Sequence, residues 1–110
     1  MPVAKNDPWL KESPIDQIAG TNVAISYTVV FEGITTVTVN AITVWKDGTN
    51  VTATTMPAGT HTASGNRLTM APLTALIYPG NYVILMEVDV DGQDDAWQLL
   101  VRAKERGGIN

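Results

Sequence analysis

The sequence predicts an all-β protein, a single antiparallel β-sandwich of about seven strands. Apolar and polar residues alternate with a period of two in several windows, as in strands with one buried face. Turn signals separate these windows at spacings of roughly 8–12 residues, as in sandwiches. The 110 residues include fourteen threonines and twelve valines but one phenylalanine, and no window of helical length carries an i, i+3, i+4, i+7 apolar stripe. Both observations favour strands over helices.

Residues 1–20 are predicted to form an extended arm ahead of the sandwich at residues 21–106, with a tail at residues 107–110. The arm holds three of the six prolines, so no helical or strand period is sustained there. It contains no apolar core of a secretory signal. Four of its apolar residues are expected to anchor it on a neighbouring subunit: Trp9, Leu10, Ile15 and Ile18. The alternative is a disordered leader, the usual state of a proline-rich terminus.

The first half of the sandwich is predicted to contain three strands. Residues 23–31 alternate with little interruption, and Glu32-Gly33 ends them. Residues 37–44 alternate with one slip of phase, which indicates a bulge or a strand buried on both faces. Asp47-Gly48 is a two-residue hairpin signal, since both residues tolerate a positive φ. Residues 49–56, rich in β-branched threonine, are expected to return as a strand exposed on one side.

The second half is predicted to contain a short strand and a long hairpin. The short strand covers residues 67–71 and ends at Pro72. Residues 81–91 alternate, with apolar side chains inward and acidic ones outward, and Asp91-Gly92 marks a second tight turn. Residues 96–103 return as the closing strand.

The run from Leu73 to Val83 (LTALIYPGNYV) resembles the corner between strands E and F of fibronectin-type-III and immunoglobulin-like domains. In that corner a leucine precedes a Pro-Gly turn, and a tyrosine, here Tyr82, opens the next strand. The tyrosine ring packs under the turn while its hydroxyl caps a backbone group. The resemblance therefore implies an immunoglobulin-like sandwich and no particular activity.

A second resemblance covers more of the chain. Short motifs are similar to those of the small immunoglobulin-like proteins of tailed bacteriophages: WKDGT at 45–49, LT at 68–69, PGNY at 79–82, DG at 91–92, LVR at 100–102 and the polar leader KNDPWLK at 5–11. The resemblance implies a structural protein of the virion, such as a capsid decoration protein or another head or tail part. The implied partners are the major capsid protein or other virion subunits, further copies of the chain are expected, and the virion would assemble in the host cytoplasm. No site residue is transferred.

Composition disfavours several other classes. Charged residues are 16% and hydrophobic residues 45% of the chain, a balance that disfavours disorder. The net charge of −4 disfavours a nucleic-acid partner, and the longest apolar stretch, residues 83–86, is too short to span a membrane. There is no cysteine, and His61 is the sole histidine, in a loop with no recognisable nucleophile beside it. We therefore expect no enzyme, no catalytic residue and no cofactor.

Carboxylates gather near the second hairpin, at Asp89, Asp91, Asp94 and Asp95. Calcium takes six to eight oxygen ligands on flexible loops, so these four are the one candidate metal site. The spacing does not follow the EF-hand pattern. A solvated hairpin tip whose charges discourage edge pairing is the preferred interpretation.

Residues 17–86 carry only four charges, at Glu32, Lys46, Asp47 and Arg67. Sheet edges are usually protected by charged side chains, so this neutral stretch predicts a surface that neighbouring subunits cover. Trp45 is also named as an interface residue, since a tryptophan on a strand belongs either to the core or to an interface. The alternative is a carbohydrate- or protein-binding immunoglobulin-like or fibronectin-type-III-like module of an adhesin, which would require two exposed tryptophan rings on one face.

Overall fold

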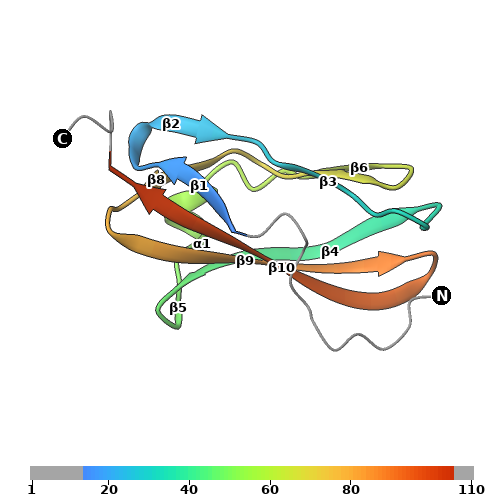
Figure 1. The fold of residues 1–110 in the computed structure, drawn as a ribbon. Helices are drawn as coiled ribbons and strands as arrows, with labels where there is room; N and C mark the ends of the chain where they lie inside the picture. Colours follow the sequence, from blue (N-terminus) through green and yellow to red (C-terminus); the bar gives the residue numbers. More distant parts are fainter. Residues whose placement is uncertain (1–13, 106–110) are drawn as a thin grey trace.

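The computed structural model describes residues 14–105 (Figure 1). In chain order the elements are β1 (Ile15–Ile18), β2 (Gly20–Ile25), β3 (Thr28–Val30), β4 (Val37–Lys46), β5 (Thr49–Asn50), α1 (Thr52–Thr55), β6 (Thr62–Ser64), β7 (Arg67–Thr69), β8 (Leu73–Leu76), β9 (Gly80–Val90) and β10 (Gln93–Lys104). Within residues 14–105, the one helix is far too short and polar to cross a bilayer.

The strands form two layers, which confirms the predicted all-β sandwich (Figure 1). One layer is a five-stranded sheet in the order β1-β10-β9-β4-β5. The other layer contains the pair β2-β8 and the three-stranded set β3-β7-β6. The β1–β10 pair is parallel, while the remaining described pairs are antiparallel. We call these the large and the small layer.

Apolar side chains from both layers meet in one core. In β9 every second side chain is buried, as the alternation predicts: Tyr82, Ile84, Met86, Val88 and Val90. Val44 of β4 and Val101 of β10 flank them in the large layer, and Leu68 and Leu73 face them from the small layer, all four fully buried. Burial of these faces is the main source of the stability of the fold.

Both predicted hairpin turns are confirmed. Asp47 and Gly48 have φ values of 52° and 81°, and Asp91 and Gly92 have 48° and 86°. Two consecutive positive φ angles define the turn that matches the twist of a two-stranded ribbon, and glycine and aspartate adopt it readily. The phase slip in β4 is also confirmed as an irregularity between Val39 and Ala41.

The prediction of a strand over residues 49–56 was wrong. The strand β5 ends at Asn50, and one helical turn, α1, replaces the remainder. Asn50 Oδ1 accepts hydrogen bonds from the backbone N–H and the hydroxyl of Thr52, at 3.0 and 2.7 Å. The Thr55 hydroxyl donates to the Val51 carbonyl at 2.8 Å. These local side-chain bonds compete with a sheet ladder, so β-branched composition alone did not decide the structure.

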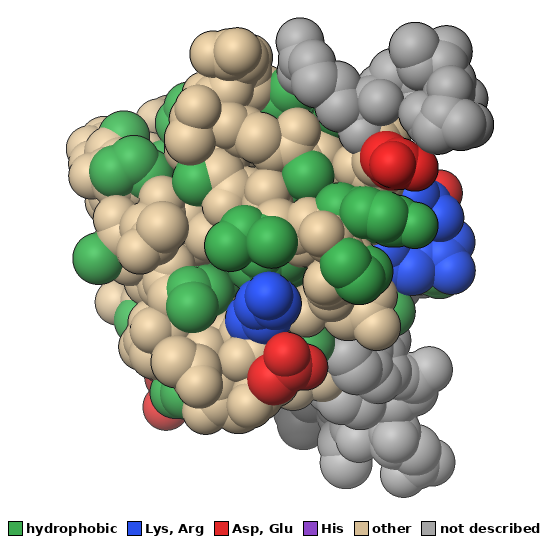
Figure 2. All heavy atoms as spheres, turned by 90° about the vertical axis from the view of Figure 1, so that its left-hand side faces the viewer, with side chains coloured by type: hydrophobic (Ala, Val, Ile, Leu, Met, Phe, Trp, Pro, Cys, Tyr) green, Lys and Arg blue, Asp and Glu red, His purple; other side chains and the backbone are tan. Residues whose placement is uncertain are grey.

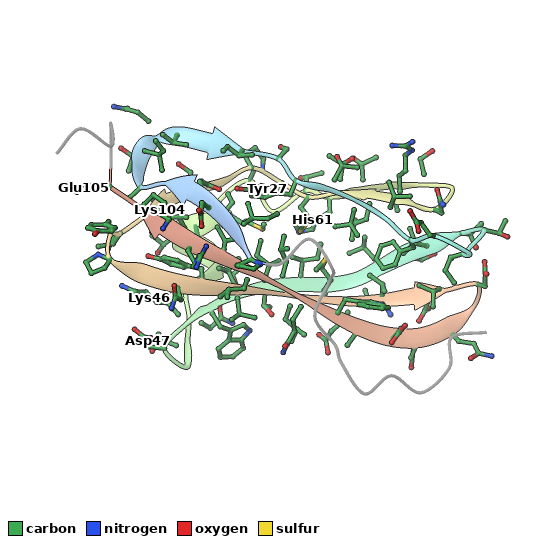
Figure 3. All side chains as sticks on the ribbon, viewed as in Figure 1. Tyr27, Lys46, Asp47, His61, Lys104 and Glu105 are labelled. Carbon is green, nitrogen blue, oxygen red and sulfur yellow. The ribbon has the colours of Figure 1, made fainter. Side chains whose placement is uncertain are left out.

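The N-terminal boundaries also differ from the prediction. Residues 15–18 do not belong to an arm, because they form β1 beside β10, and the expected single strand at 23–31 is divided between β2 and β3. Gln17 joins β1 to the opposite layer: its Nε2 donates to the Leu73 carbonyl at 2.8 Å, and its Oε1 accepts from the Tyr27 hydroxyl at 2.7 Å. Tyr27 is labelled in Figure 3. These two hydrogen bonds connect β1 of the large layer to the small layer.

Candidate functional site: an apolar end of the sandwich

Five large apolar side chains are exposed among the described residues: Ile18, Ile25, Val30, Ile77 and Tyr78. Ile18 of β1 pairs with Lys104 of β10, and the preceding residue of β10, Ala103, pairs with Gly80 of β9. Ile18 therefore lies at the same end of the sandwich as the loop before Gly80. That loop carries Ile77, which is 63% exposed, and Tyr78, which is 49% exposed. We call Ile18, Ile77, Tyr78 and the adjacent exposed Pro79 the end patch. Figure 2 shows this end, with several apolar side chains gathered near its centre.

The β8–β9 loop is held rigidly beneath these side chains. The hydroxyl of buried Tyr82 accepts a hydrogen bond from the Ile77 backbone N–H at 2.9 Å, as the resemblance to the E–F corner implied. Gly80 allows the loop to pass closely, since a Cβ there would lie 2.8 Å from the Ile77 carbonyl oxygen and 3.0 Å from Lys46 Cε. Ile77 and Tyr78 are thus presented on a preorganised turn, so binding would cost little additional ordering.

Charged side chains lie along part of the border of the end patch (Figure 2). Lys46 Nζ lies 5.6 Å from the centre of the Tyr82 ring, while Arg102 Nε contacts Asp16 at 3.0 Å and Lys104 Nζ approaches the same carboxylate at 3.9 Å. Figure 3 places Lys46, Asp47, Lys104 and Glu105 at this end of the molecule. An apolar centre with a charged rim is the usual arrangement of a protein–protein interface.

The predicted interface residues have separate locations. Trp9 and Leu10 lie outside the described residues. Ile15 is half-buried and packs against the core opposite buried Val101, and its predicted role at an interface stays a prediction. Ile18 belongs to the end patch. Ile77 and Tyr78 were missed, although their place beside a Pro-Gly turn, which is solvent-exposed in most folds, was a usable signal.

Trp45 lies half-buried on the face of the large layer that points away from the core. Its indole Nε1 donates to the Thr43 hydroxyl at 2.9 Å, and Val83 stands opposite it on β9. Trp97 points to the core side of the same sheet and meets Phe31 edge to face, with ring centroids 6.3 Å apart. These two rings therefore do not form the shared platform that a carbohydrate-binding module would require.

The four aspartates considered for calcium have different partners. Asp91 Oδ1 accepts from the backbone N–H groups of Thr36 and Thr35 at 2.9 and 3.0 Å, and these bonds hold the pKa of Asp91 below its usual value. Asp95 accepts from the Trp97 indole N–H at 3.1 Å. Among residues 14–105, no group of three acidic or histidine side chains is placed to hold a metal ion. The carboxylate of Asp91 instead ties the β3–β4 loop to the hairpin.

Asp89 and Asp94 form a pair of carboxyl groups near the Asp91-Gly92 turn. They lie opposite each other on β9 and β10, and a hydrogen bond between them raises the pKa of Asp94 and lowers that of Asp89. Asn40 Nδ2 also donates to Asp89, at 3.1 Å. An open depression of about 420 Å³ lies beside the pair, lined by Asn40, Glu87, Val88, Asp94, Asp95 and Ala96. Its lining is acidic, with Glu87, Asp94 and Asp95 as the charged side chains.

His61 serves the structure of its loop. Its Nδ1 accepts a hydrogen bond from the Ala71 backbone N–H at 3.0 Å, and partial burial lowers the pKa of the imidazole. The neutral ring is the form that accepts this bond, so burial and hydrogen bonding favour the same protonation state. His61 thereby attaches the loop before β6 to the chain between β7 and β8.

Comparison of the chain with protein-family models, with curated proteins and with solved structures gives no match.

Proposed function

We propose that the chain is a non-enzymatic structural subunit of a bacteriophage virion, a capsid decoration protein or another head or tail part. It binds the major capsid protein or another virion subunit through the end patch. The observation that carries this proposal is the exposure of Ile77 and Tyr78 on a turn locked by Tyr82. Full burial of one such side chain contributes about 1.5–3 kcal/mol. A few preorganised anchors of this kind dominate the energy of most interfaces.

The phage assignment is supported by the sequence motifs described above and by the distribution of charge. Residues 17–86 form most of the sandwich with four charged side chains, whereas the charged rim of the end patch includes Asp16, Arg102 and Lys104. Rim charges set orientation and partner choice more than affinity. Trp9 and Leu10 remain predicted anchors on a neighbouring subunit, and the proposed setting remains the virion, assembled in the host cytoplasm.

To test the proposal, virus particles are released from the cells that encode the chain and purified on a density gradient. The chain is expected in these particles at a fixed copy number. The double variant Ile77→Ser/Tyr78→Ser should remain in the soluble fraction, because it removes the apolar anchors. The matched variant Ile77→Val/Tyr78→Phe keeps the apolar surface and should enter the particles. Particles without the wild-type chain, or with equal amounts of both variants, would refute the proposal.

A further inference from the structure

The two remaining exposed apolar residues, Ile25 and Val30, lie on β2 and β3, at an edge of the small layer. In the large layer, β1 pairs with β10. After β1 the chain passes to the small layer at Ala19, whose N–H donates to the Lys104 carbonyl at 2.9 Å. Within residues 14–105, β2 pairs only with β8, and β3 only with β7. No described strand therefore flanks the outer side of β2 and β3, which follow one another along the upper layer in Figure 1.

The backbone of this edge offers hydrogen-bonding groups to the outside. The Tyr27 carbonyl accepts from the Met70 N–H, and the Phe31 N–H donates to the Asn66 carbonyl, both at 2.9 Å. Peptide groups of successive residues in an antiparallel ladder point to opposite sides. Thr28 and Val30 consequently direct their N–H and C=O groups to the open side. An added strand would find donors and acceptors at the spacing of a sheet.

The side chains also indicate a missing neighbour. Ile25 lies opposite Leu73, which is fully buried, so Ile25 faces the core side of the layer. It is nevertheless 37% exposed, as an inward side chain at an uncovered edge should be. A strand paired with β2 and β3 would cover it.

No charged side chain of β2 or β3 protects this edge. No charged residue occurs from residue 17 to residue 31, although lysines and other charges normally prevent edge-to-edge pairing. An irregularity between Gly20 and Ala24 disturbs the first part of β2, which leaves residues 24–30 available. We call residues 24–30 the edge segment. The edge of β4 near Val44, by contrast, is covered by bonds from Val51 and Thr52.

We propose that the edge segment is a strand-addition site that pairs, antiparallel, with the edge segment of a second copy of this chain. A strand edge is complementary to itself about a twofold axis, and two uncharged segments meet without repulsion. Residues 1–13 fit the site less well, because they contain two prolines and four charged side chains. Pairing would join the β6-β7-β3 set of each copy into one continuous sheet. This surface is separate from the end patch, and the proposal stands without it.

The test is sedimentation velocity with full-length protein at concentrations from about 1 to about 300 μM, a range that resolves a micromolar dimer. Thr28→Pro removes an N–H that points outward, so it breaks the added ladder and no backbone bond between β3 and β7, while the 3.1 Å hydroxyl bond of Thr28 to Thr69 is lost with the side chain. Thr28→Lys places a charge at the edge. Both variants are expected to weaken dimerisation at least about tenfold, while the matched Thr60→Lys, at an exposed loop position, leaves it unchanged.

Hydrogen exchange identifies the surface directly. The amide protons of Thr28 and Val30 should become protected only at concentrations where the dimer forms. A wild-type chain that stays monomeric, or Thr28 variants that fold and dimerise normally, would overturn the proposal. Loss of the dimer on deletion of residues 1–13, with the Thr28 variants unaffected, would overturn the choice of occupant. The Ile77→Ser/Tyr78→Ser variant should dimerise normally, which separates this proposal from the proposed function.

Discussion

The bridge made by Gln17 between the two layers can be measured by removing its amide. Gln17 is 2% exposed, and its two hydrogen bonds, of 2.8 Å to Leu73 and 2.7 Å from Tyr27, both cross from β1 to the small layer. Gln17→Leu keeps most of the side-chain volume but leaves the Leu73 carbonyl without this donor. A buried group that loses its partner costs about 1–3 kcal/mol. The Tyr27 hydroxyl is only partly buried and can turn to water, so we expect about 2 kcal/mol in total.

Urea unfolding followed by tryptophan fluorescence measures this loss. Tyr27→Phe removes one bond and should cost about 1 kcal/mol. The double variant should cost about 2 kcal/mol, less than the sum, because the bond of Tyr27 is already lost in Gln17→Leu. The control Gln98→Leu, at a half-buried position on β10, should change stability by less than about 0.5 kcal/mol. A Gln17→Leu variant as stable as this control, or fully additive single variants, would refute the bridge.

Three further predictions concern the turns. Tyr82→Phe removes the acceptor of the Ile77 N–H and should cost about 1 kcal/mol, seen as a Tm lower by about 4–8 °C. Gly80→Ala brings a Cβ to 2.8 Å from the Ile77 carbonyl oxygen, so calorimetry should show a loss of about 1–3 kcal/mol, and unchanged stability would mean that the loop is not held closely. The pKa of Asp91 is lowered in the folded state, so its carboxylate contributes stability above the unfolded-state pKa, and this stability is lost as the pH falls through the folded-state pKa. Asp91→Asn should therefore flatten the acid side of a plot of the urea midpoint against pH. An unaltered plot would contradict the role of the bonds from Thr35 and Thr36.

The parts of the fold that the sequence predicts are those that local chemistry decides. Asp47-Gly48 and Asp91-Gly92 specify their turns through positive φ angles, and the alternation of β9 follows from one buried face. The parallel pairing of β1 with β10 is decided by contacts between residues 86 positions apart, such as the bond from Arg102 to Asp16, and no local period reveals it. The local patterns of one sequence carry no information about such long-range pairings.

The candidate site was predicted only in part for the same reason. Ile18 was expected at an interface, but Ile77 and Tyr78 come from a loop about sixty residues later in the chain, and only the register of β1, β10 and β9 places them at the same end of the sandwich. The inward direction of Ile15 depends on the same register. In β5 and α1, the bonds of Asn50 to Thr52 outweighed the strand preference of the threonines.

The most direct measurement of the central claim is hydroxyl-radical footprinting of the chain in isolated particles and in free solution. Tyr78 is 49% exposed and Tyr82 is 2% exposed, so Tyr82 serves as an internal control in the same peptide region. If the end patch binds a neighbouring subunit, oxidation of Tyr78 and Ile77 should fall severalfold in the particle while that of Tyr82 stays low in both. Equal oxidation of Tyr78 in the two states would show that this end of the sandwich remains in water, and would contradict the proposed interface.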